Sequence, residues 1–86
     1  MAKFEVRFKR SAAKELLKLP HLDNRRIMSR IQSLAENPRP PGCERLAGRE
    51  SYRVRQGDFR IIYTIDDERV IVEVIRVGHR SDVYKH

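Results

Sequence analysis

The stretch YRVRQGDFRIIYTIDDERVIVEVIRVGHRSDVY, residues Tyr52–Tyr84, decides the fold. Two runs rich in β-branched and aromatic residues, YRVRQ and DFRIIYTI, meet at Gly57-Asp58, and a third, RVIVEVIRV, follows the turn residues Asp66-Asp67-Glu68. Such runs, separated by Gly and Asp, predict a meander of three antiparallel strands. We expect the third strand to end at Val77, because Gly78 permits a sharp turn there.

A two-residue loop at Gly57-Asp58 would fix the register of the first hairpin. It pairs Gln56 with Phe59, Arg55 with Arg60, and Val54 with Ile61. Side chains alternate across a strand, so one face carries the apolar set. That set is Tyr52, Val54, Phe59, Ile61 and Tyr63. The other face carries Arg53, Arg55 and Arg60.

Three arginines on one face of a hairpin repel one another, at a cost of roughly 0.2–1 kcal/mol per opposed pair. One interpretation is that they are solvated and screened, with their stems covering apolar surface. The other is that the face binds a polyanion, whose phosphates turn the repulsion into attraction. Spacing alone leaves both open.

Composition narrows the classes of function. The chain has 86 residues, 19 Lys and Arg against 12 Asp and Glu, and a formal net charge of +7. We expect one domain, residues 1–86, with an open groove rather than an enclosed cofactor pocket. The positive charge points to nucleic acid, an anionic surface or an acidic protein partner.

The same residues predict what the protein lacks. The only cysteine, Cys43, has no internal disulfide partner, and the three histidines show no ligand spacing, so we expect no structural metal and no cofactor. The N-terminus has charges where a signal peptide needs apolar residues, and no run is long enough for a membrane span. We therefore expect a cytoplasmic protein without a membrane partner.

The rest of the chain completes an α+β fold. Residues 4–9 alternate strictly and predict a first strand. A short helix follows with Ser11 as its N-cap and stops before Pro20, and a second helix runs from near Asp23 to about Glu36. The segment RPPGCERLAGRES is expected to be irregular. The predicted architecture is an N-terminal strand and a helical hairpin packed on a twisted, mainly antiparallel, four-stranded sheet.

With these residues in view, the chain resembles the RelE/ParE superfamily of type II toxin–antitoxin toxins. The resemblance covers nearly the whole chain and is strongest in RLAGRESYRVRQGDFRIIYTI, in VIVEVIRVGHRSDVY and in the strand–helix–helix opening. It implies a RelE-like fold, similar to microbial ribonucleases, and a cognate acidic antitoxin as partner. RelE-type members cleave mRNA in the ribosomal A site, whereas ParE-type members inhibit DNA gyrase without cleaving RNA.

The positions that match RelE-type motifs favour the endoribonuclease, with gyrase inhibition as the alternative. The resemblance assigns catalysis to Arg60, Arg80 and Tyr84, and binding of RNA phosphates to Arg53 and Arg55. RelE-type members often carry lysine at the positions of Arg53 and Arg55. Arginine is a poorer proton donor than lysine.

The reaction implied is attack of the ribose 2′-OH on the phosphodiester, which needs a base and stabilisation of the phosphorane. Tyr84 is the expected base, although its unperturbed pKa is about 10, and nearby arginines would lower it. His79 is an alternative for proton transfer. Either side chain could instead be structural, Tyr84 as a packing tyrosine and His79 as a loop histidine.

Overall fold

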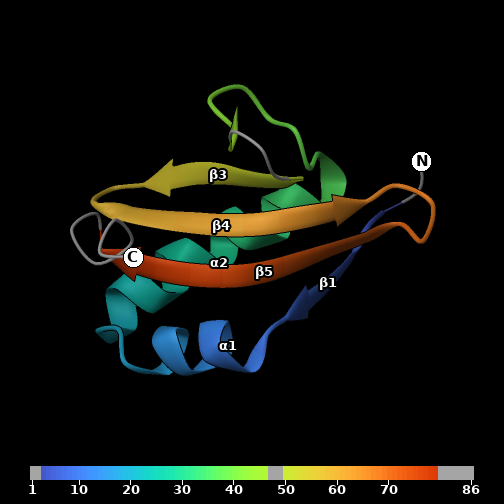
Figure 1. The fold of residues 1–86 in the computed structure, drawn as a ribbon. Helices are drawn as coiled ribbons and strands as arrows, with labels where there is room; N and C mark the ends of the chain where they lie inside the picture. Colours follow the sequence, from blue (N-terminus) through green and yellow to red (C-terminus); the bar gives the residue numbers. More distant parts are fainter. Residues whose placement is uncertain (1–2, 47–49, 80–86) are drawn as a thin grey trace.

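A five-stranded sheet with helices on one face and along one edge forms the protein (Figure 1). The computed structural model describes residues 3–46 and 50–79. The elements are β1 (Glu5–Phe8), α1 (Arg10–Leu17), α2 (His21–Glu36), β2 (Glu44–Arg45), β3 (Ser51–Gln56), β4 (Phe59–Asp66) and β5 (Ile71–His79). Strand order is β1-β5-β4-β3-β2, with β1 parallel to β5 and the other pairs antiparallel. The predicted α+β architecture is confirmed.

The first hairpin has the predicted register. Gln56 pairs with Phe59, Arg55 with Arg60, and Val54 with Ile61. Gly57 has φ +61° at the first central position of the two-residue loop, the conformation that a type II′ turn requires. The turn therefore fixes which side chains of β3 and β4 point to the apolar face of the sheet and which point to the arginine-bearing face.

A bulge in β5 changes which residues of that strand reach the core. Ile62 pairs with Arg76 but its neighbour Tyr63 pairs with Val74, so Ile75 is an extra residue. Before the bulge the buried positions are Val72 and Val74, and after it the buried position is Val77. If Ile75 were paired regularly instead of bulged, strict alternation after Val72 and Val74 would turn Arg76 toward the core.

Two details of the predicted strands are wrong. The sheet has five strands, because the segment expected to be irregular contains β2, which pairs Glu44 with Arg53 and Arg45 with Tyr52. The last strand does not end at Val77: Gly78 pairs with Arg60 inside β5. The ladder to β4 supplies partners for the backbone of Gly78, which outweighs its freedom to turn.

The predicted helix caps are also wrong. The N-cap positions are Lys9 and Pro20, neither with a side-chain cap, and Asp23 lies in the first turn of α2, where its charge complements the helix dipole. The corner between the helices is closed instead by Asn24, whose Nδ2 donates to the carbonyl oxygen of Leu16 at 2.9 Å. Neither helix in the described residues has the length and apolar character that crossing a membrane requires.

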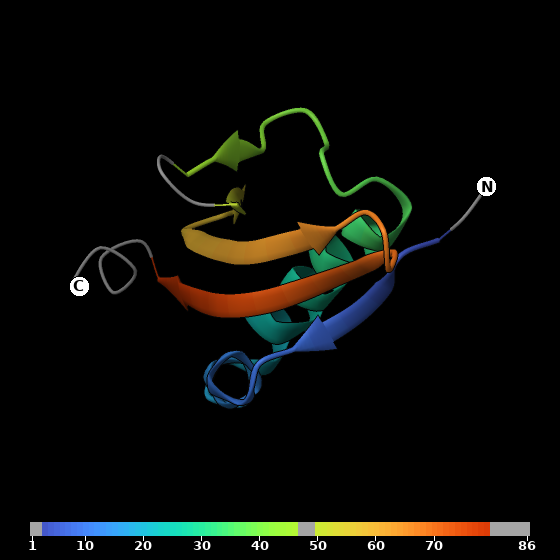
Figure 2. The same ribbon diagram turned by 45° about the vertical axis from the view of Figure 1, so that its right-hand side comes forward.

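The two helices lie in different places relative to the sheet. Figure 1 and Figure 2 show α2 crossing behind the strands and α1 running along the edge beyond the end of β1. The fully buried residues of α2, Ile27, Ile31 and Leu34, pack with the inner side chains of β3, β4 and β5. The opposite face of the sheet, here called the open face, has neither of the two described helices over it (Figure 1).

Tyr63 is the largest fully buried side chain. Its hydroxyl donates to the carbonyl oxygen of Pro38 at 2.7 Å, and burial raises its pKa, which keeps the donor protonated. Its ring stacks on Tyr52 with centroids 5.9 Å apart, and Arg39 lies over the Tyr52 ring at 5.3 Å. This stack fastens the segment after α2 to the sheet.

We expect Tyr63→Phe to lower the free energy of unfolding by about 1–3 kcal/mol, because the buried carbonyl of Pro38 loses its donor. Urea denaturation followed by circular dichroism measures the change. The matched control is Tyr52→Phe, which deletes the same atom from an exposed contact with Arg39 Nε at 3.3 Å and should cost less than about 0.5 kcal/mol. Equal losses in the two variants would show that the Tyr63–Pro38 bond is unimportant.

Candidate functional site

The predicted arginines gather on the open face at the end of the sheet that carries the β3–β4 turn. Two rows of paired residues cross the strands there. One row is Arg55, Arg60 and Gly78, and the other is Arg53, Ile62 and Arg76. Directly paired residues share a face, so four arginines project from the same end of one surface. The predicted site residues Arg80 and Tyr84 lie outside the described residues.

The opposite end of the open face carries charges of both signs. Glu73 pairs with Thr64 on one side and with Arg7 on the other, and Asp66 lies at the end of β4. The excess of positive charge on this face is therefore largest at the turn end of the sheet. Such a charged patch attracts polyanions to one place on the surface.

Arg60 differs from the expectation of a solvated arginine. Its exposed fraction is only 4 %. The residue opposite it on β5 is Gly78, which has no side chain, so there is room beside β4 for the Arg60 stem. A buried arginine is held in a defined position, which suits a group that must meet a reacting phosphate.

Arg53 and Arg76 already have acidic partners. Arg53 Nη2 lies 3.2 Å from Glu44 Oε1, a pair that ties β2 to β3. Arg76 Nη2 lies 3.5 Å from Glu15 Oε2 on α1. Because Arg53 has an acidic partner inside the protein, a phosphate bound at its predicted site would have to compete with Glu44.

Arg55 is exposed and, within the described part of the chain, has no ion pair. It lines a small hollow of about 70 Å³ together with Arg60 and the turn residues Gly57 and Asp58. The exposed Arg55 and the buried Arg60 thus line the same hollow from neighbouring strands.

His79 shares a face with Phe59, not with Arg60. It pairs with Phe59 across β4 and β5, and the two rings meet edge to face at 5.7 Å. Phe59 belongs to the side of the sheet that α2 covers. The structure therefore brings Arg55 and Arg60 together and turns His79 to the other side.

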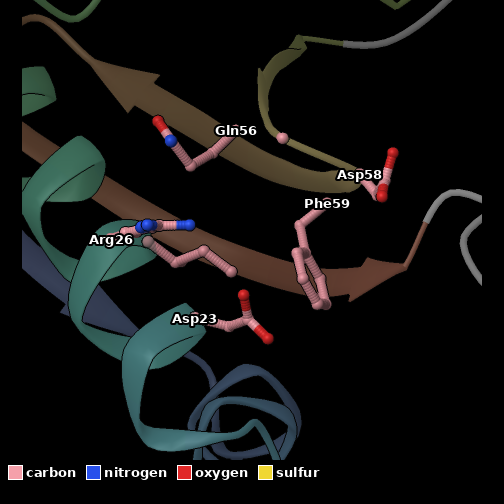
Figure 3. A pocket seen from close by; sticks show the side chains of 7 residues that line it. Asp23, Arg26, Gln56, Asp58 and Phe59 are labelled. Carbon is pink, nitrogen blue, oxygen red and sulfur yellow. The ribbon is translucent and has the colours of Figure 1, made fainter.

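A second hollow lies on that other side, between α2 and the β3–β4 turn. It has a volume of about 160 Å³ and is shown in Figure 3. Asp23 points toward the Phe59 ring, whereas Asp58 points away from the helix. Ile27 and Phe59 give it apolar walls, and its lining includes two acidic residues, Asp23 and Asp58, against one basic residue, Arg26. The arginine-rich open face therefore suits an anion better than this hollow does.

Sequence reasoning missed two further arginines near the site. Arg76 follows the bulge, whose position no turn residue signals. Arg30 lies on α2, and nothing in the helical spacing shows that it lines a groove together with Arg55 of β3. Within residues 3–46 and 50–79, no three His, Cys, Asp or Glu side chains form a group that could hold a metal ion.

Glu15 supports the strand that borders the site. β1 pairs with β5 only as far as Val74, which leaves the next backbone groups of β5 at an open edge. Glu15 Oε1 accepts a hydrogen bond from the Val77 N–H at 2.9 Å and so takes the place of a neighbouring strand.

We expect Glu15→Ala to lower the free energy of unfolding by about 1–3 kcal/mol, because the half-buried Val77 N–H loses its acceptor and Arg76 its counter-ion. Glu15→Gln is the matched control, since its amide oxygen can still accept from Val77 while the charge is lost. Hydrogen exchange of the Val77 amide should be faster in the alanine variant and close to the parent in the glutamine variant. Parental exchange in Glu15→Ala would contradict this role.

Comparison with known proteins places this geometry in context. Residues 6–84 match a family model described as the ParE toxin of the type II toxin–antitoxin system parDE. Toxin RelG of Mycobacterium tuberculosis is 34% identical over 90 residues, which cover 95% of this chain and 97% of that protein. The mRNA interferase toxin RelE of Escherichia coli K12 is 31% identical over 81 residues, 90% of this chain and 85% of that protein.

Solved structures show the same arrangement of elements. A chain in the crystal structure of the toxin–antitoxin complex RelBE2 from Mycobacterium tuberculosis superposes with a TM-score of 0.81 and 30% identity, over 91% of this chain and 99% of that one. The likeness therefore covers the fold over most of the chain.

Proposed function

This chain belongs to the ParE/RelE family of type II toxin–antitoxin toxins, and we propose that it is a ribosome-dependent endoribonuclease that cleaves mRNA in the A site. The observation that carries the proposal is the pairing of Arg55 with Arg60 across β3 and β4, beside a hollow at the basic end of the open face. Relatives named as RelE toxins and an mRNA interferase support the choice of RNA as substrate.

The proposed reaction follows the chemistry of RNA itself. The ribose 2′-OH attacks the adjacent phosphorus in line with the leaving 5′ oxygen, and negative charge grows on the phosphorane. Arg60 and Arg80 hold this phosphate and stabilise the charge, and Arg55 binds the neighbouring backbone with help from Arg53. Because the nucleophile comes from the substrate, the proposed reaction requires no metal bound by the protein.

Tyr84 is the proposed general base. Its ordinary pKa of about 10 is high for this task, and arginine charges close to it would favour the tyrosinate and lower the pKa. His79 is the alternative, but its ring contacts Phe59 on the helix-bearing side of the sheet, away from the Arg55–Arg60 pair. This contact favours Tyr84. A weak acid–base set suits an enzyme whose substrate is oriented by the ribosome.

An acidic antitoxin is the proposed partner that restrains the toxin. Its acidic residues would pair with the arginines of the open face, and apolar residues would cover exposed leucines. Leu17 and Leu22, at the corner between the helices, are 83 % and 58 % exposed. Exposed apolar side chains of this size favour a bound protein segment. A solved structural relative is a toxin–antitoxin complex, which supports the pairing.

Inhibition of DNA gyrase is the second candidate function. It is favoured by the family model, whose description names ParE. A gyrase inhibitor needs a surface that binds a protein rather than a phosphate-binding pair with a base. The positions Arg55, Arg60, Arg80 and Tyr84 are all occupied by residues that RNA cleavage can use, so the endoribonuclease is preferred.

We expect Arg60→Gln to slow cleavage of mRNA in a reconstituted ribosome complex by about 10²–10³-fold, because one donor to the phosphorane is lost. Single-turnover cleavage, with thermal unfolding as a check on the buried site, measures the effect. Arg69→Gln removes the same charge from the exposed β4–β5 turn and serves as control. A folded Arg60→Gln variant that cleaves at the parental rate would refute the phosphate role of Arg60.

Tyr84→Phe tests the general base with a change of one atom. The cleavage rate should fall by about 10²–10⁴-fold while ribosome binding and stability stay near parental values. In the parent, the rate should rise with pH until the lowered pKa of the tyrosine is passed. Parental cleavage by Tyr84→Phe would make Tyr84 structural and His79 the next residue to substitute.

A further inference from the structure

A second basic groove shares a lining residue, Arg55, with the Arg55–Arg60 hollow. Arg55 lines both the small hollow beside Arg60 and a larger open groove of about 510 Å³. The other residues of this groove are Arg30 on α2, Gly42 and Cys43 in the segment before β2, and Glu44 in β2. The groove therefore leads from the open face over the β3 side of the sheet toward α2.

Among residues 3–46 and 50–79, the Arg30 guanidinium has no acidic counter-ion, and its buried Nε has no hydrogen-bond partner. A buried donor without an acceptor is costly and uncommon in folded proteins. An anion in the groove would meet the part of the guanidinium that lines it and would supply the missing counter-charge.

The charges that line the groove favour an anion. Arg30 and Arg55 contribute two positive charges that no described acidic residue pairs with. The only acid among the lining residues is Glu44, and Arg53 already lies 3.2 Å from its carboxylate. Arginine binds phosphate through its planar fork, and it does so most strongly where water is partly excluded.

We propose that Arg30 binds a backbone phosphate of the mRNA strand as the strand leaves the Arg55–Arg60 hollow, so that the substrate track runs from the open face around β3 to α2. The proposal rests on the proposed endoribonuclease function and extends it to a residue on a helix. Continuity through Arg55, which belongs to both spaces, favours the substrate strand itself over a separate ligand.

The test uses ribosome complexes programmed with two mRNAs. One extends through the A site and carries 2′-deoxyribose in the A-site codon, which removes the nucleophile and prevents cleavage. The other stops after the P-site codon. Binding of the full chain and of its variants is measured by fluorescence anisotropy across a range of salt concentrations. Arg55→Gln is the reference, and Arg25→Gln, which removes an exposed charge from the same helix, is the matched control.

Arg30→Gln should weaken binding to the full-length mRNA complex by about tenfold, as loss of one hydrogen-bonded charge predicts. The slope of log affinity against log salt should fall by about 0.7, the value for one phosphate on a single strand. Arg30→Lys should recover part of the affinity, and Arg25→Gln should match the parent. Neither Arg30→Gln nor Arg25→Gln should change binding to the complex whose mRNA stops after the P-site codon.

Cys43 gives an independent signal, because it is the only cysteine and it lines the groove. Full-length mRNA should slow its alkylation by maleimide, and Arg30→Gln should reduce this protection. Equal losses of affinity with both mRNAs would assign Arg30 to ribosomal RNA and overturn the proposal. The proposal would also be overturned if Arg30→Gln lost affinity only for an acidic peptide and bound both ribosome complexes like the parent.

The same measurements separate failure of the Arg30 proposal from failure of the proposed endoribonuclease function. If Arg55→Gln weakens binding and a folded Arg30→Gln does not, only the extended track is wrong. If neither variant changes binding and the parent does not distinguish the two mRNAs, the substrate assignment itself fails.

Discussion

The register of the β3–β4 hairpin is the constraint on which the rest of the structure depends. Gly57 adopts a positive φ and closes a two-residue turn, so Val54 must pair with Ile61 and Arg55 with Arg60. A slip of one residue would turn the core side chains to solvent and the arginines to the helices. Core formation and the basic site therefore share one cause: burial of the apolar face forces like charges together on the other. The bulge at Ile75 extends this division to β5, because it keeps Val77 inside and Arg76 outside.

Acidic partners divide the arginines of this basic protein into two groups. Arg39, Arg53 and Arg76 are paired with Asp67, Glu44 and Glu15, and each pair joins two segments of the fold. Arg30 and Arg55 form no ion pair among the described residues and share a groove. Net charge alone cannot make this distinction, whereas pairing separates arginines that hold the protein together from those that can bind a substrate. In this account the second group, with the buried Arg60, positions the RNA for cleavage.

Local sequence patterns predicted most of the fold and part of the site. The turn at Gly57-Asp58 and the alternation of β3 and β4 are local signals, and both gave the observed register. The bulge at Ile75 and the two-residue β2 could not be predicted, because each depends on packing against a distant strand. For the same reason the sequence showed neither the burial of Arg60 nor the Glu44 partner of Arg53. Arg80 and Tyr84 lie outside the described residues, so their roles rest on resemblance alone.

The measurement that tests the account most directly is a map of RNA 5′ ends in cells that express the toxin, combined with a supercoiling assay of gyrase exposed to the purified protein. RNA cleavage at the Arg55–Arg60 site predicts discrete breaks within translated codons, no breaks outside translated regions, and gyrase of normal activity. Intact mRNA together with loss of supercoiling would contradict the account and assign the open face to a protein target.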